Sequence, residues 1–331
     1  MIQKSINSLG VGLAVVAMVA MATMASPLAR AQAWVPQRNV EFVAPAGAGG
    51  AMDTFTRALE SVARETKALP VTSMVTSKPG GEHAVAYNYL QQKAGDPHVL
   101  VLTSPVLLTN HITGVLPVTY RDFTPVATMM SEYYLYVVHP EAPFKTPGDL
   151  VSALVQRPES LSLGAGNQPQ RMVLGMMLLS AKADIRRAKI VTISGAKVAL
   201  SVAGGHVDMG VAAPGQALPL VEGGKLRALA VSSPKRLGGA LAAVPTWTES
   251  GYPDLRSGSW RAIIAAKNLT PAQLAYWEGL MRRIANSAEL RAMAEKHQWD
   301  LEFQDAAQTR KDMEADYERL KRVMQFMGMV K

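Results

Sequence analysis

The feature that most constrains the fold is a strand that runs through a glycine-rich turn directly into a helix, over residues 40–55. Val40–Ala44 is apolar like a buried strand, glycines fill the turn at 47–50, and an amphipathic pattern starts at Met52. Such a junction points free backbone N–H groups at one spot, on the positive end of the helix dipole. The spot suits an anion, and the unit is typical of α/β proteins.

The first 33 residues have the pattern of a cleavable export signal. Lys4 gives a basic start, residues 9–25 are almost continuously apolar, and Ala31-Gln32-Ala33 is a small-x-small cleavage site. We expect cleavage after Ala33 and a mature chain, 34–331, in the periplasm. A membrane anchor is the alternative, but the apolar run is short for a span.

Strands and helices alternate along the rest of the chain, which predicts an α/β fold. Residues 125–138 read as one unusually long strand that crosses between two halves, and 257–265 returns as a second extended crossing. Lobe one is therefore expected at 34–135 plus 257–331, and lobe two at 136–256. Two α/β lobes joined by paired crossings form a ligand trap that closes about a hinge.

Residues for catalysis or cofactor binding are not apparent. The turn at 47–52 lacks the third glycine of G-x-G-x-x-G, and no acid ends the next strand near Ser77 to hold a ribose. The six histidines show no metal-ligand spacing, cysteine is absent, and there is no G-x-S-x-G motif. The basic residues are spread out and not interleaved with aromatics as in nucleic-acid binders. We therefore expect no enzyme activity, no cofactor, no metal site and no nucleic-acid partner.

A second glycine turn, over 164–171, leads into a helix predicted at 172–182, so each lobe has one polar turn that opens a helix. The candidate ligand-binding residues are those of the two turns and of the neighbouring strand ends: Ala46, Gly47, Ala48, Gly49, Gly50, Asp53, Thr103, Ser104, Gly166, Asn167, Gln168, Arg171, Gly195 and Lys197.

Each charged or hydroxyl candidate has two interpretations. Asp53 either complements the dipole of its own helix or recognises an ammonium or hydroxyl of the ligand. Arg171 either is solvated or pairs bidentately with a carboxylate, and Lys197 has the same alternatives. Thr103 and Ser104 either donate hydroxyls to the ligand or cap the end of their strand.

Several short motifs, taken in order, resemble those of the Bug (TctC-like) family, the extracytoplasmic solute receptors of tripartite tricarboxylate transporters. The match to the family's P-x-x-x-G-G-x-x-D loop ends at Asp53. Further matches are the proline-glycine turn at 78–81, Y-x-D-F-x-P-V at 120–126, G-G-x-V-D at 204–208, G-K-x-R-x-L-A-V at 224–231 and V-P-T at 244–246.

The resemblance implies a type II periplasmic-binding fold without catalysis, monomeric, with a small carboxylate held between the lobes. The loaded receptor would deliver its solute to membrane permease subunits of a tripartite tricarboxylate-type transporter. A solute sensor that signals to a membrane sensor kinase has the same sequence features and stays open as an alternative. Two stretches depart from the family pattern: Gln168–Met172 replaces the usual G-S-x-x-H continuation, and Ala212-Ala213 replaces an aspartate-asparagine pair.

Overall fold

A computed structural model describes residues 34–166, 168–193, 197–255, 257–297 and 299–330. The predicted export signal at 1–33 lies outside the described residues. Within those residues, no helix combines the length and the apolar run that crossing a bilayer requires.

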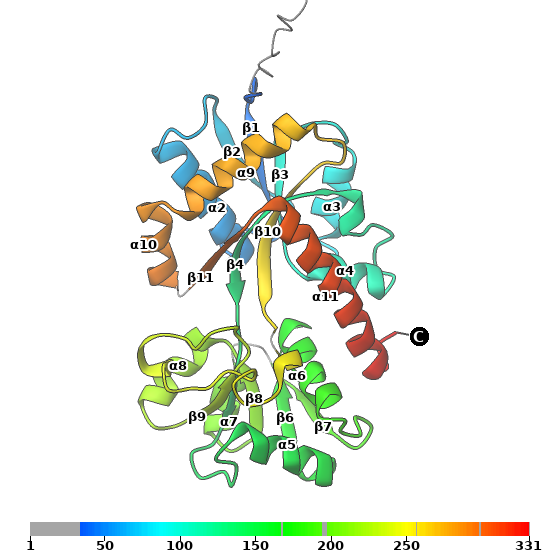
Figure 1. Cartoon of the computed structure of the whole chain (residues 1–331), viewed down its shortest axis with the longest axis vertical. Coiled ribbons are helices and arrows are strands. Elements are labelled where there is room, and N and C mark those ends of the chain that lie inside the picture. Colours follow the sequence, from blue (N-terminus) through cyan, green and yellow to red (C-terminus); the bar gives the residue numbers. More distant parts are fainter. Residues whose placement is uncertain (1–33, 167, 194–196, 256, 298, 331) are drawn as a thin grey trace, which may run out of the picture. The chain divides into compact units, whose positions relative to one another are not determined.

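The first sheet has six strands in the order β11-β4-β10-β3-β1-β2 (Figure 1). Its strands are β1 (Val40–Ala44), β2 (Ser73–Ser77), β3 (Val99–Thr103), β4 (Thr124–Glu132), β10 (Ser259–Ala265) and β11 (Asp300–Gln304). β1 pairs in parallel with β2 and β3, whereas β10 pairs antiparallel with both β3 and β4. β3 is buried along its whole length, which explains its uninterrupted apolar sequence.

The second sheet has five strands in the order β7-β6-β8-β5-β9. Its strands are β5 (Leu135–Val138), β6 (Ser162–Ala165), β7 (Lys189–Thr192), β8 (Met209–Ala212) and β9 (Arg227–Val231). β6 pairs in parallel with β7 and β8, and β5 is antiparallel to β8 and β9. With two sheets flanked by helices, the predicted α/β class is confirmed.

The helices divide between the two sheets as Figure 1 shows. Beside the first sheet lie α2 (Ala51–Glu65), α3 (Ala84–Gln91), α4 (Val106–Ile112), α9 (Pro271–Ala285) and α10 (Ala288–His297). Beside the second lie α5 (Pro147–Gln156), α6 (Gln168–Ser180), α7 (Val198–Ala203) and α8 (Pro214–Glu222). Short 3₁₀ helices, labelled η, lie at η1 (Tyr120–Asp122), η2 (Pro158–Ser160), η4 (Gly239–Leu241) and η5 (Pro253–Leu255).

Local capping chemistry fixes where several helices begin. The Thr146 hydroxyl accepts a hydrogen bond from the Asp149 N–H, and the Asp149 carboxylate accepts one from the Thr146 N–H, at the start of α5. Thr270 and Gln273 form the same reciprocal box at the start of α9, where Pro271 occupies the first turn. These boxes satisfy N–H groups that have no partner within a helix, so the starts of α5 and α9 were predictable from sequence.

The prediction of one continuous strand over 125–138 is wrong. β4 ends at Glu132 and β5, in the other sheet, starts at Leu135. At the break, the Tyr134 N–H donates to the Ser232 hydroxyl at 2.9 Å, while the Tyr134 carbonyl accepts from the Ser232 N–H, also at 2.9 Å. Both strands are buried, so the apolar pattern continues across the break and conceals it.

The helix predicted at 172–182 starts earlier, at Gln168, so Arg171 lies inside the first turn of α6 and not in a glycine loop. α8 starts at Pro214, because proline is well suited to the first helical position. The residues after the Thr103–Ser104 strand end form α4.

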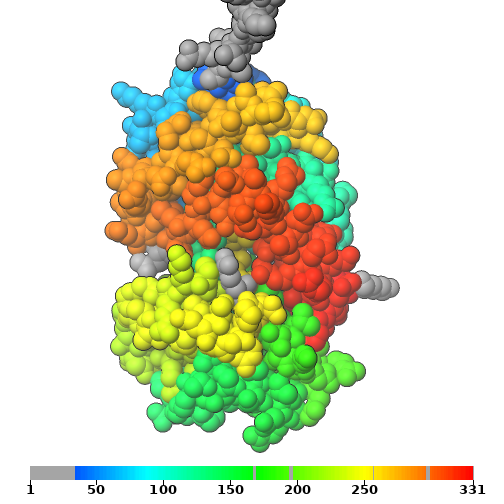
Figure 2. Space-filling view, viewed as in Figure 1, coloured from blue at the N-terminus to red at the C-terminus, as the bar shows by residue number. Residues whose placement is uncertain are grey.

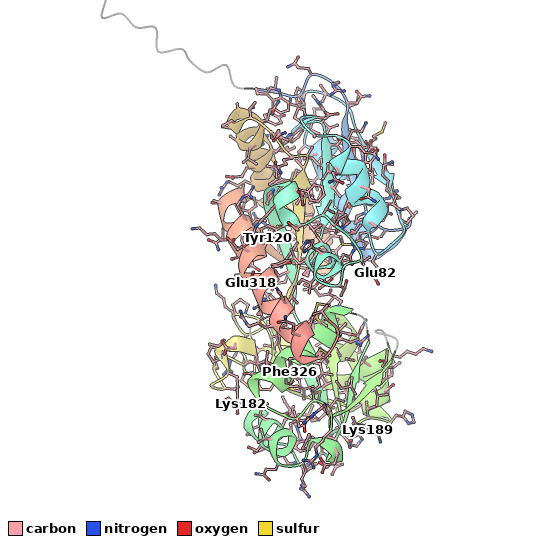
Figure 3. All side chains as sticks on the ribbon, turned by 90° about the vertical axis from the view of Figure 1, so that its right-hand side faces the viewer. Glu82, Tyr120, Lys182, Lys189, Glu318 and Phe326 are labelled. Atoms are coloured by element: carbon pink, nitrogen blue, oxygen red, sulfur yellow. The ribbon has the colours of Figure 1, made fainter. Side chains whose placement is uncertain are left out.

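Helix α11 (Ala306–Phe326) contacts elements of both sheets. Near its start, the Thr309 hydroxyl accepts a hydrogen bond from the Thr128 N–H of β4 at 2.8 Å. Near its end it packs on α6, so closely that a Cβ added at Gly175 would lie 2.9 Å from the Val323 side chain. Figure 3 shows Phe326, at the end of α11, beside the helices of the five-stranded sheet.

Candidate ligand-binding site

The loops that follow the parallel strands gather at one edge of each sheet. β1 and β3 pair with Val43 opposite Val101, so the glycine turn after β1 and the Thr103–Ser104 end of β3 lie at the same edge. In the second sheet, Ala165 of β6 lies opposite Thr192 of β7, and β8 runs parallel beside them. Ligands of parallel α/β sheets bind outside these carboxyl ends.

Elements of both sheets line one large cavity of about 1160 Å³, which we call the cleft. The six-stranded side contributes Gly49, the first turn of α2, β4, β10, α10 and β11, and the other side contributes the start of α8 and residues 237–241. In Figure 2 the surface is hollowed between the orange segment that includes α10 and the yellow-green segment that includes α8. The cleft therefore brings the first glycine turn opposite the N-terminus of α8.

Two other cavities border the same strands. A small one of about 30 Å³ brings Pro105 and Val106, after β3, against Pro169 and Met172 of α6. Another, of about 630 Å³, lies among β4, α11, α6 and η5 and includes Trp260. The glycine turn lines the cleft and is absent from the described lining of both other cavities, so the cleft is the candidate ligand site.

The first glycine turn offers backbone donors. Gly49 has φ +81°, a left-handed conformation that glycine adopts without strain, and its turn is closed by a Gly50 N–H bond to the Gly47 carbonyl at 3.1 Å. The N–H groups of Gly47 and Ala48 make no hydrogen bond with any described residue. Both residues are exposed, and Ala46 beside them is half-buried.

Asp53 is 1% exposed and holds this turn in place. One carboxylate oxygen accepts from the Gly49 N–H at 2.9 Å and from Arg57 Nε at 2.8 Å, and the other accepts from the Ser77 hydroxyl at 2.8 Å. The Arg57 guanidinium, with the Gly49 and Ser77 donors, lowers the pKa of Asp53 to about 2 although burial opposes this. Asp53 is thus charged and internally paired, as expected for its first interpretation, a residue that orders the helix start.

Thr103 and Ser104 are also buried and engaged within the fold. The Thr103 hydroxyl lies 2.9 Å from the Tyr87 hydroxyl, and Ser104 Oγ accepts from the Val106 N–H at 3.4 Å. Neither residue lines the three cavities described above. In this structure Ser104 binds the first N–H group of α4, and Thr103 is paired with Tyr87.

The second turn is ordered by a side chain that the sequence did not single out. The Gly166 N–H donates to the buried Gln170 side chain at 2.9 Å. Arg171 is half-buried in α6, and its Nε is buried without a hydrogen-bond partner among the described residues. Lys197 is exposed just before α7. Gln168 is the first residue of α6, while Asn167 and Gly195 lie outside the described residues.

Other residues that line the cleft were not predicted. Phe55 and Trp299 form an aromatic wall with an edge-to-face contact, their ring centroids 4.8 Å apart. Gln216, in the first turn of α8, has a buried side-chain oxygen without a partner. Arg261 of β10 and Glu132 of β4 face each other, with 3.5 Å between Nη2 and Oε2. The sequence signal that could have revealed Arg261 as a site residue is that it is the one charged residue of the strand SWRAIIA.

The charges around the cleft are mixed. Two arginines, Arg261 and Arg291, and four carboxyl groups line it: Glu132, Glu222, Glu295 and Asp300. Burial and the nearby Glu302 raise the pKa of Asp300 above its ordinary value. Across the described part of the chain, no three His, Cys, Asp or Glu side chains cluster in a way that could hold a metal ion.

Comparison with known proteins identifies the family. The model of the tripartite tricarboxylate transporter family receptor, TctC, matches residues 55–329. Protein BugT of Bordetella pertussis is 25% identical over 267 residues, which cover 78% of this chain and 79% of that protein. The chain therefore belongs to the TctC receptor family, and the resemblance found in the sequence is confirmed.

Solved structures agree on the fold. A TctC solute-binding protein from Polaromonas, solved without ligand, has a TM-score of 0.78 at 22% identity, covering 88% of this chain and 99% of that one. R. palustris Rpa4515, solved with adipate, has a TM-score of 0.64 at 22% identity, covering 88% and 98%. The predicted two-lobed periplasmic-binding fold is confirmed.

Proposed function

We propose that this chain is a periplasmic receptor that captures a small carboxylate in the cleft and delivers it to the permease subunits of a tripartite tricarboxylate-type transporter. The observation that carries the proposal is the cleft itself, where the first glycine turn faces the start of α8. Membership of a receptor family supports binding without catalysis. The adipate bound in Rpa4515 supports a carboxylate as the ligand class.

The backbone donors of the first turn suit a carboxylate. Because Arg57 neutralises the charge of Asp53 at 2.8 Å, the acid in the first turn of α2 does not cancel the attraction of the helix N-terminus for an anion. The free N–H groups of Gly47 and Ala48 lie beside it. We include the remaining predicted residues of both turns as contacts that form when the lobes close on the solute.

Closure requires a hinge, and we place it where the chain passes between the sheets. The first crossing, Tyr133–Tyr134, and the second, which arrives at Ser257, both hydrogen-bond to Ser232: the Ser232 N–H donates to the Tyr134 carbonyl at 2.9 Å, and the Ser257 N–H donates to the Ser232 carbonyl at 3.0 Å. Lobe one, 34–135 plus 257–331, and lobe two, 136–256, would rotate about these bonds. A short hinge of few residues is the usual device for such closure.

A thermal-shift screen of the purified protein tests the proposal. Succinate, malate, glutarate, adipate, citrate and benzoate at millimolar concentration form the panel, and the amides in which every carboxyl group of the same acid is replaced are the controls. A ligand that binds only the folded state raises the unfolding temperature by mass action. We expect at least one acid to do so and its amide not to. A panel without any shift would contradict the proposal, and co-purification with a sensor kinase instead of permease subunits would contradict delivery.

A further inference from the structure

Arg261 is directed toward the cleft by the alternation of β10. Its neighbour Trp260 lies on the opposite side of the strand, where it lines the 630 Å³ cavity and donates from Nε1 to Asp316 at 2.8 Å. Successive side chains of a strand point to opposite faces. Arg261 accordingly faces the cleft, which Gly49 and the start of α8 also line.

The fold holds one end of the guanidinium rigidly. Nη1 donates to the Ser259 carbonyl at 3.1 Å, to the Ser259 hydroxyl at 2.6 Å and to the Trp260 carbonyl at 3.2 Å. The side chain is only 15% exposed. Its orientation is therefore set before any ligand arrives, which lowers the entropy cost of binding.

The other edge of the guanidinium has unused donors. Nη2 makes one long contact, 3.5 Å to Glu132 Oε2, and Nε makes no hydrogen bond with any described residue. Nε and Nη2 together form the fork that binds a carboxylate through two parallel hydrogen bonds. Glu132 does not fill this fork, because it contacts Nη2 and not Nε. Its side chain is 37% exposed, and the same carboxylate also accepts from the Tyr134 hydroxyl at 3.4 Å.

We propose that Arg261 determines ligand class in this chain: its Nε–Nη2 edge pairs bidentately with a carboxylate of the solute, which displaces Glu132. The inference rests on the proposed function and names the residue that supplies the charge complement. Arg261 and the first glycine turn would then hold two different parts of one solute, such as the two carboxylates of a dicarboxylic acid. The exchange with Glu132 makes the solute compete with an internal carboxylate.

Titration calorimetry with adipate and with malate, on the full protein and four variants, tests this. Arg261→Gln should weaken binding about 10- to 100-fold, the range expected when a charged bidentate pair is lost. Arg261→Lys keeps the charge without the fork and should recover only part of the affinity. Arg186→Gln is the matched control, since Arg186 is an exposed arginine that pairs with Asp184 and does not line the cleft, and it should change affinity less than about 2-fold.

Glu132→Gln gives an independent readout if Arg261→Gln folds poorly. Removing the competing carboxylate should tighten adipate and malate binding about 3-fold or more. Unchanged affinity in Arg261→Gln, or weaker affinity in Glu132→Gln, would overturn the inference while leaving the proposed function intact. If the unmodified protein binds neither these acids nor any other of the panel, the proposed function fails and the inference fails with it.

Discussion

The replacement of Asp53 by asparagine tests how the first glycine turn is held. The Asp53 carboxylate accepts from the Gly49 N–H, Arg57 Nε and the Ser77 hydroxyl, all within 2.9 Å. Asparagine keeps one acceptor oxygen and turns the other into a donor, which then faces donors. The turn should lose its anchor at Gly49, and carboxylate binding should weaken together with stability.

The cost can be worked from the pKa. The pKa of Asp53 is lowered from 3.8 to about 2. Each pH unit of that difference corresponds to about 1.4 kcal/mol, so about 2 kcal/mol of the unfolding free energy depends on the charged carboxylate. Arg57 is 51% exposed, and solvent screening reduces its share. With the mispaired amide added, we expect Asp53→Asn to cost about 2–3 kcal/mol at pH 7.

The pH dependence gives the signature of this mechanism. Because the folded-state pKa is lower than the unfolded-state pKa, the stabilisation is complete above about pH 5 and is lost as the pH falls toward 2. Urea unfolding followed by tryptophan fluorescence, from pH 7 to pH 3, measures it. The stability difference between the unmodified protein and Asp53→Asn should be constant from pH 7 to about pH 5 and should shrink below that.

Glu318→Gln is the control, since Glu318 is exposed on α11 and should leave stability unchanged at every pH. A difference between the unmodified protein and Asp53→Asn of less than about 0.5 kcal/mol at pH 7 would refute the reasoning. So would a difference that stays the same down to pH 3, because the charge of the carboxylate would then not be its source.

Three further predictions concern other parts of the fold. Gly50→Val places a Cβ 3.2 Å from the Gly47 carbonyl oxygen and a branched side chain over the turn. This variant should lose carboxylate binding in calorimetry and keep an unchanged circular dichroism spectrum. Retained affinity would contradict the placement of the site. Burial and the positive Arg261 lower the pKa of His83 to about 4, so stability should fall as the pH drops from 6.5 toward 4, by at most about 1.4 kcal/mol per pH unit. His83→Gln should flatten this slope in urea unfolding, and an equal slope in both proteins would count against the prediction. Gly175→Ala places a Cβ 2.9 Å from the Val323 side chain and should destabilise the protein by about 1–3 kcal/mol in thermal unfolding. Gly279→Ala, in an open part of α9, is the control and should not destabilise it. Equal effects of the two substitutions would contradict close packing of α11 on α6.

Local signals made much of the first sheet predictable. β1 has the predicted bounds, because a buried parallel strand is an apolar run that ends at turn residues. The Thr270 cap and the proline after it mark the start of α9 for the same kind of reason. Such features depend on a few neighbouring residues, so one sequence is enough.

Features that depend on distant partners were missed. The break at Tyr133–Tyr134 is fixed by Ser232, almost a hundred residues away, and the apolar pattern carries no trace of it. The place of Arg261 in the cleft was missed for the same reason, because its ion-pair partner Glu132 lies on another strand. Of the predicted site residues, Gly49 lines the cleft, Asn167 and Gly195 lie outside the described residues, and the others are not part of the described cleft lining.

The capture of a carboxylate between two closing lobes is tested most directly by a distance across the cleft. The sequence contains no cysteine, so Met74→Cys on β2 and Leu200→Cys on α7 can be spin-labelled selectively; both positions are more than half exposed. Double electron–electron resonance should give a shorter, narrower distance distribution with the acid that gives the largest thermal shift. The amide of that acid should leave the distribution unchanged. The same distribution with and without saturating acid would contradict capture by closure.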